Sequence, residues 1–378
     1  MRRDWTRNQP TTQPKTGGPG NTRDFTPGTG TGPPAATRCW TGDRRPHAGG
    51  IHGQPPQAGP CPTTSQPARL PPESTMTFVD VHFHLAPASF IRQKPNRVFD
   101  IYPQLGDGAL GRQELAAAGG RAFVSLPWPV PPGADVEATA TATSSCNDEL
   151  LAAAAEHVEY AGAMIAVDLT DPARAVTEVR RTADAQAMAG VMIYVSPTSR
   201  LDEEGLHEFY AELSARRLPL FLHPALEPPI GGATDWSLDA SLSPPVVTST
   251  AAARLMLSGR LDEHPGLTLI IPHLGGVLPY LAQRLIDQSG RGAALHDIPT
   301  YLRTRTYVDT CSFHPPALRC ALDTIGPSRL VLGSDYPFRG PVARAIADIA
   351  DSGVDETFKE SALIGNATAA IRTAAGAV

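Results

Sequence analysis

Apolar, strand-like runs alternate along this chain with Ala- and Leu-rich stretches of helical spacing, and this alternation limits its fold more than any other feature. Most of the apolar runs are continuous, as in parallel strands that are buried on both faces. We expect eight strands, at 78–82, 121–126, 160–167, 190–195, 218–222, 267–272, 306–309 and 329–332. Eight strand–helix units in about 300 residues predict an α/β fold of the (β/α)8 TIM-barrel type.

Helical periodicity is found between these runs. We expect helices at 148–157, 172–188, 203–216, 248–264, 279–289, 316–325 and 342–351. Ser145 and Asn147 precede the first of them and are its expected N-terminal caps.

Residues 1–75 differ in composition from the rest of the chain. They are rich in Pro, Gly, Thr and Gln and hold nine Lys or Arg against four Asp or Glu, whereas the remainder holds 23 against 34. Such a stretch cannot bury enough apolar surface to offset chain entropy, so we expect a disordered tail. Met76 opens the first strand-like run, and a misassigned start would explain the residues before it. The barrel domain is expected over 76–378.

Composition excludes several functional classes. With 32 Lys and Arg against 38 Asp and Glu, the chain is mildly acidic, which argues against nucleic acid as a partner. No apolar run is long enough to cross a bilayer, and the basic residues Arg2 and Arg3 are not followed by the apolar core of a secretory signal. The five scattered cysteines form no Cys-X-X-Cys pair and fit the reduced thiols of a cytoplasmic protein.

Histidine and aspartate side chains follow the expected strands, where the active site of a barrel lies. His82 and His84 close the first strand, and residues i and i+2 of a strand point to the same side. His223, His273 and Asp335 follow the fifth, sixth and eighth strands. Each alone could be a cap, a turn former or a satisfied loop residue, but their joint position favours a metal site. Imidazoles and a carboxylate suit a borderline divalent ion, Zn2+ before Mn2+.

The other histidines are weaker candidates for the site. His157, His207, His264 and His296 fall in helical or loop segments and are expected at the surface. His314, just past the seventh strand, could line the mouth of the site.

At these positions the chain resembles the amidohydrolase superfamily (amidohydrolase-related family 2), and within it the group that contains aminocarboxymuconate semialdehyde decarboxylase. The resemblance runs from about Phe78 to Asn366. It rests on His82-Phe83-His84, Asn147-Asp148-Glu149-Leu150, Phe221-Leu222-His223-Pro224, Pro272-His273-Leu274-Gly275-Gly276 with Pro279, Tyr280 and Arg284, Leu332-Gly333-Ser334-Asp335-Tyr336-Pro337-Phe338, and Gly365-Asn366-Ala367.

The resemblance implies a role for each matched residue. His82, His84, His223 and Asp335 take the metal-ligand positions, and His273 takes that of the catalytic acid/base, with Asp335 beside it in the catalytic site.

The resemblance also implies substrate contacts. Arg284 falls where the decarboxylase has an arginine that reaches a substrate carboxylate in the neighbouring subunit, which implies a homodimer. Trp128, His314 and Phe338 are further candidates for substrate binding. The loop after the first strand is short, and Arg92 and Arg97 are the candidates there for the family's second substrate arginine.

Lysines bear on the number of metal ions. Many members of the superfamily bridge two ions with a carboxylated lysine on the fourth strand, but this chain has only Lys15, Lys94 and Lys359, none of which lies there. The sequence therefore predicts one ion, unless a carboxylate takes the bridging position.

Three functions remain open from the sequence. The first is a metal-dependent, non-oxidative decarboxylase of an unsaturated or aromatic carboxylic acid, which the resemblance favours. The second is a hydrolase or hydratase acting on a lactone, amide or dicarboxylate, because the same residues would serve that chemistry. The third is a metal-bearing binding protein without catalysis.

Overall fold

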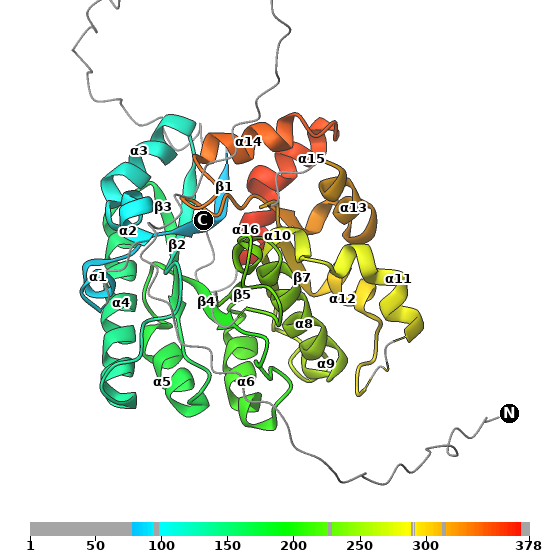
Figure 1. Ribbon diagram of the computed structural model, residues 1–378, viewed down its shortest axis with the longest axis horizontal. Helices are drawn as coiled ribbons and strands as arrows, with labels where there is room; N and C mark the ends of the chain where they lie inside the picture. Colours follow the sequence, from blue (N-terminus) through cyan, green and yellow to red (C-terminus); the bar gives the residue numbers. More distant parts are fainter. Residues whose placement is uncertain are drawn as a thin grey trace, which may run out of the picture. The chain divides into compact units, whose positions relative to one another are not determined.

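The strands of this protein form one parallel sheet in sequence order (Figure 1). The computed structural model describes residues 78–93, 98–225, 229–288, 290, 292–311 and 315–371, so the expectation for 1–75 lies outside the described residues. The strands are β1 (Val79–His84), β2 (Arg121–Ser125), β3 (Tyr160–Ala166), β4 (Met188–Val195), β5 (Leu220–Pro224), β6 (Leu269–Ile271), β7 (Thr306–Asp309) and β8 (Leu330–Val331). All eight expected strands are present, with their ends shifted by a few residues.

Backbone hydrogen bonds join the last strand region to the first. The Val81 N–H donates to the Leu332 carbonyl at 2.9 Å, and the Asp335 N–H donates to the His82 carbonyl at 2.8 Å. These bonds close the sheet, which confirms the predicted (β/α)8 barrel. The same bonds fix the segment after β8 against the histidine-bearing end of β1.

Helices surround the strands (Figure 1). The longer ones are α3 (Gly108–Ala118), α4 (Val136–Glu156), α5 (Pro172–Thr182), α6 (His207–Arg216), α8 (Ser243–Leu257), α11 (Leu278–Gln288), α12 (Ile298–Thr304), α13 (Pro315–Ile325) and α14 (Val342–Ala350). The shorter ones are α1 (Ala88–Gln93), α2 (Val98–Ile101), α7 (Leu238–Ser241), α9 (Arg260–Glu263), α15 (Glu356–Glu360) and α16 (Asn366–Ile371). Within the described ranges, no helix is both long and apolar enough to cross a membrane.

The start of α4 was predicted wrongly. The helix begins at Val136, and its N-cap is Asp135, whose side chain accepts a hydrogen bond from the Ala138 N–H at 2.7 Å. Ser145 is therefore inside the helix, where its hydroxyl donates to the Thr141 carbonyl. The Thr- and Ser-rich first half has a low helix propensity, but packing of the helix on the barrel overrides it.

Asn147, the other expected cap, is also inside α4. It is buried, its amide donates to the Ala166 carbonyl at 2.9 Å, and its oxygen accepts from the Ala166 N–H at 2.8 Å. Asn147 thus ties α4 to the end of β3.

Two other expected helices end several residues early. The region 248–264 is two helices, because Gly259 adopts the left-handed φ of 85° between α8 and α9. The region 172–188 ends its helix at Thr182, because β4 already begins at Met188.

The barrel interior is filled with apolar side chains below the strand ends. Val79, Val81 and Phe221 belong to this interior cluster, which is completed by α16. One extra residue in β1, between Asp80 and Phe83, shifts its register against β2. This bulge reverses the alternation of side chains, so His82 and His84 face the same interior as Val81.

Candidate metal centre and its surroundings

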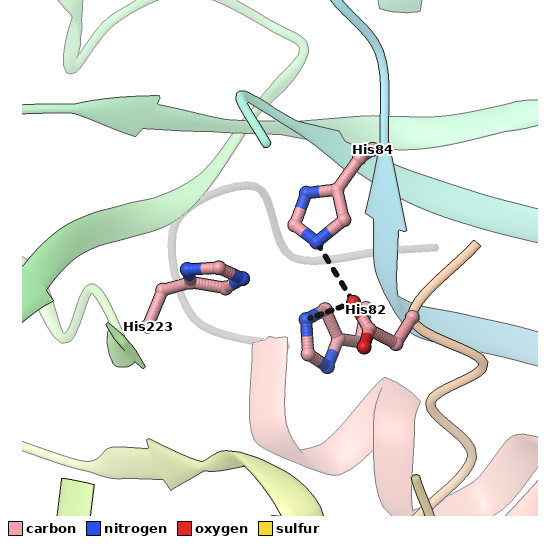
Figure 2. A group of neighbouring side chains, drawn as sticks. His82, His84 and His223 are labelled. Carbon is pink, nitrogen blue, oxygen red and sulfur yellow. Dashed lines mark ion pairs between the residues drawn. The ribbon is translucent and has the colours of Figure 1, made fainter. Parts of the chain in front are cut away.

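Four predicted ligand side chains meet at the carboxyl ends of the strands. His82 and His84 come from β1, His223 from β5 and Asp335 from the segment after β8, and their ligand atoms lie within 4.8 Å of one another. Figure 2 shows the three imidazoles turned toward a common space. The Asp335 Oδ1 is 3.3 Å from both the His82 Nε2 and the His84 Nε2.

The second ring nitrogen of each histidine is held by the protein. The His84 Nδ1 lies 3.1 Å from the Leu126 carbonyl, and the His223 Nδ1 lies 2.9 Å from the Pro224 carbonyl. Since a carbonyl only accepts, these contacts place the ring proton on Nδ1 and leave the Nε2 lone pair free.

Two of the candidate ligand nitrogens are buried without a hydrogen-bond partner. Within the described residues, the Nε2 atoms of His82 and His84 are buried and make no hydrogen bond. Unpaired buried nitrogens are costly, and three imidazoles with a carboxylate form a donor set for one divalent transition ion. The residues present therefore fit the ion that the sequence predicts.

Burial and contacts among these side chains shift the pKa values of the group. Burial by itself would raise the pKa of Asp335, but the neighbouring His82, His273 and His84 hold it well below its ordinary value. Burial lowers the pKa of His223 well below its ordinary value, and nearby His84 and His82 add to this effect. Asp335 as a carboxylate and His223 as a neutral imidazole are in the states that bind a cation. The pKa of His82 is shifted the other way: burial lowers it, but Asp335 and Asp309 outweigh burial and raise it to about 9, so an ion would displace the proton of His82.

Asp309 supports the group from behind, and the sequence reasoning missed it. Its Oδ2 lies 2.6 Å from the His82 Nδ1, and its Oδ1 accepts from the backbone N–H groups of His273 and Cys311 at 2.7 and 3.0 Å. Asp309 is fully buried at the end of β7. Its position at a strand end is the same signal that identified Asp335, so it was visible in the sequence.

Asp80 holds the loop that carries Asp335 through hydrogen bonds. Its carboxylate accepts from the backbone N–H groups of His82 and Ser334 and from the Ser334 hydroxyl. Burial raises the pKa of Asp80 to about 6 although these hydrogen bonds lower it. The network fixes the loop that carries Asp335 to the strand that carries His82.

His273 lies at the edge of the group. It falls in the segment labelled α10 (Pro272–Gly275), which is a turn, because His273 and Leu274 have left-handed φ angles of 57° and 56°. The His273 Nε2 is 3.8 Å from the Asp335 Oδ2, and its side chain is 19% exposed. His273 therefore borders the group and is partly exposed to solvent.

Aromatic rings border the group on the side of His84. The Phe338 ring lies 5.6 Å from the His84 ring, 5.1 Å from Tyr102 and 6.2 Å from Trp128. Phe338 and Trp128 are half-buried. The structure thus brings Phe338 next to the candidate ligand His84, and Trp128 next to Phe338.

The remaining candidates are placed differently. Arg284 is exposed on α11, and within the described ranges it forms no ion pair. Arg92 pairs with Glu149 at 3.4 Å, with its side chain 67% exposed. Arg97 and His314 lie outside the described residues.

The fourth strand offers no bridging ligand. β4 holds neither lysine nor carboxylate, and its Tyr194 ring packs 5.5 Å from the His223 ring. A site for one ion therefore agrees with both the sequence and the structure.

Comparison with known proteins agrees with this geometry. The amidohydrolase family model matches residues 79–373. The chain belongs to the amidohydrolase family. The family assignment confirms the resemblance found in the sequence.

Two similar proteins are named as decarboxylases. Over 212 residues the chain is 26% identical to a 6-methylsalicylic acid decarboxylase from Penicillium expansum, covering 54% of this chain and 65% of that protein. Over 218 residues it is 28% identical to a gamma-resorcylate decarboxylase from Rhizobium sp. MTP-10005, covering 51% and 64%. The chain thus spans slightly less than two thirds of the length of these relatives.

Solved structures share the fold. One is a dihydroxybenzoic acid decarboxylase from Polaromonas sp. JS666 with bound manganese and the inhibitor 2-nitroresorcinol. It matches with a TM-score of 0.70 and 23% identity, over 79% of this chain and 97% of that one.

Proposed function

We propose that this amidohydrolase is a metal-dependent, non-oxidative decarboxylase of an aromatic or unsaturated carboxylic acid. The observation that carries the proposal is the position of His273, whose Nε2 lies 3.8 Å from the Asp335 Oδ2. His273 is not a member of the four-residue ligand group, although it forms a smaller group of ligand-type side chains with Cys311 and Asp335. A histidine there is free to move a proton while the ligands hold the ion. The relatives named as decarboxylases of aromatic acids support the same function.

The ion would be held by His82, His84, His223 and Asp335. When bound, a divalent ion at this position supplies a Lewis acid that polarises a substrate oxygen. The three imidazoles favour Zn2+ by ligand type, whereas one solved relative carries manganese. We propose Zn2+ as the first choice and Mn2+ as the second. Metal analysis of the purified protein tests this order.

His273 would deliver the proton. In the reaction the bond between the carboxyl carbon and the substrate breaks, CO2 leaves, and the electron pair stays on the substrate carbon. A proton from His273 then neutralises that carbon. Asp309 accepts the His273 N–H at 2.7 Å and so fixes the turn from which the imidazole reaches the substrate.

Trp128 and Phe338 would bind the body of the substrate. The half-buried ring of Phe338 beside His84, with Trp128 beside Phe338, favours a planar, apolar ring stacked close to the ion. For the substrate carboxylate we propose Arg284 of the second subunit in a homodimer, because within one chain Arg284 is exposed on α11. An arginine matches a carboxylate through two parallel hydrogen bonds.

Hydrolysis or hydration is the alternative for the same group. The test is a screen of metal-reconstituted protein against aromatic acids, unsaturated dicarboxylic acids, lactones and amides, with CO2 and acid release both measured. 2,6-Dihydroxybenzoate and 6-methylsalicylate are the first substrates to include. The proposal expects CO2 from a carboxylic acid without consumption of O2. Acid release from a lactone or amide, with no CO2 from any acid, would establish the alternative.

A further inference from the structure

A second group of ligand-type side chains lies in the outer layer of helices. His207 is the first residue of α6, Glu263 is the last residue of α9, and His264 follows it directly. Their ligand atoms lie within 4.8 Å of one another. Figure 1 shows α6 and α9 as neighbours outside the barrel. The group shares no residue with the candidate metal centre.

His264 is the buried member of this group. It is only 4% exposed, contrary to its expected surface position, and its ring lies 4.7 Å from that of His207. Within the described part of the chain, its Nε2 is buried and has no hydrogen-bond partner. Burial lowers the pKa of His264, and a charged His207 would lower it further. His264 is therefore a neutral imidazole with an unused ring nitrogen.

The surrounding charges favour a cation. Arg260 pairs with Glu263 at 2.7 Å and with Glu204 at 2.6 Å, so one guanidinium faces two carboxylates. Arg305, which donates to the His264 carbonyl at 2.9 Å, and nearby Asp262 add one charge of each sign. The local balance is therefore one negative charge, before any contribution from the two imidazoles. A bound cation would offset that excess without breaking the pair between Arg260 and Glu204.

The geometry is close to that of a metal site. The His207 Nδ1 lies 3.9 Å from the Glu263 Oε2, and ligands of a tetrahedral Zn2+ site lie about 3.4 Å apart, given bonds of about 2.1 Å. The His207 and Glu263 side chains are 54% and 43% exposed, so rotation of either closes the remaining gap. His264 is held in place by burial.

We propose that His207, Glu263 and His264 bind a borderline divalent ion such as Zn2+, with water completing the coordination. Two imidazoles and one carboxylate with an open position form a known type of zinc donor set. The ion would connect the start of α6 to the end of α9. The inference concerns binding and stability and does not rest on the proposed reaction.

Zinc titration of the holoenzyme by calorimetry tests the site. With the metal centre already loaded with zinc, the wild type is expected to take up one further equivalent. His207→Ala should lose this equivalent, whereas His296→Ala, which removes an exposed histidine that is not a member of the group, should keep it. His84→Ala, which disables the proposed metal centre, should also keep it, so the two sites are distinguished.

Thermal melting supplies a second readout. An ion that binds only the folded protein raises its Tm, so added zinc should raise the Tm of the wild type and of His296→Ala but not of His207→Ala. Glu263→Gln removes the negative charge but keeps a side chain of about the same size. It should also weaken the zinc-dependent rise in Tm. Absence of a further equivalent in the wild type would overturn the site. Full zinc binding by a folded His207→Ala would overturn it as well.

Discussion

The carboxylate of Asp309 holds His82 from behind, with its Oδ2 2.6 Å from the His82 Nδ1. Its other oxygen accepts two backbone N–H groups, those of His273 and Cys311. One buried carboxylate thus orients a candidate metal ligand and the turn that carries the candidate acid/base. Such outer partners fix the orientation and raise the basicity of ligating histidines.

Asp309→Asn is expected to weaken metal binding. An amide can accept at its oxygen only, so its NH2 group would face either the His82 ring proton or the two backbone N–H groups. We expect metal affinity to fall about 10- to 100-fold, measured by competition with a chelator. Asp323→Asn, which changes an exposed aspartate on α13, serves as the control and should bind metal as the wild type does. Unchanged affinity in Asp309→Asn would contradict the orienting role.

Each of the four candidate ligands should be needed for the tightly bound ion. Alanine at His82, His84, His223 or Asp335 removes one donor of a single site, so each variant should lose most of its metal. Metal analysis after removal of loosely held ions should find about one equivalent in the wild type. His296→Ala is the control. A ligand variant that keeps its full equivalent would exclude that residue from the site.

Arg284→Ala should weaken substrate use without loss of metal. The exposed position of Arg284 on α11 leaves it free to reach a second subunit. Mixing Arg284→Ala with His273→Ala should then restore part of the activity, because a mixed dimer holds one site with both groups intact. If verified mixed dimers show no restored activity, each site is built from one chain.

Glu178→Gln should destabilise the protein in a pH-dependent way. Burial alone would raise the pKa of Glu178, but hydrogen bonds from Arg181, Asn147 and Ser144 lower it below its ordinary value of 4.5. A carboxylate with a lowered pKa in the folded state stabilises the protein above its unfolded pKa, and that stability is lost as the pH falls through the folded pKa.

The measurement is the free energy of unfolding of both proteins at neutral and acid pH. At neutral pH we expect Glu178→Gln to lose about 1–3 kcal/mol, since it disrupts a half-buried network. The difference should shrink well below pH 4.5, where wild-type Glu178 is itself protonated. A constant difference across this range would mean that the charge of Glu178 does not stabilise the fold.

The strands and the ligand positions could be predicted from the sequence because both follow from short-range pattern. Continuous apolar runs marked the strands, and the strand ends marked His223, His273 and Asp335. The bulge in β1 could not be predicted, because it appears only in the pairing of β1 with β2. Without it, the alternation of side chains would not place Val81 and His82 on the same side.

Features that depend on tertiary contacts were missed. The first half of α4 is rich in Thr and Ser, and only its packing on the barrel makes it helical. The burial of His264 results from the approach of α6 to α9, which local sequence does not reveal. Asp309 differs from these cases, because its place at a strand end was visible and was overlooked.

The most direct test of the account is one decarboxylation measurement in D2O with wild-type protein and His273→Ala. With a substrate found in the screen, the wild type should release one CO2 for each product molecule and place one deuterium on the carbon that lost it. His273→Ala should keep its metal and lose about two to four orders of magnitude in turnover, the range for a positioned acid/base. Wild-type turnover without CO2, or a His273→Ala variant that retains metal and full activity, would contradict it.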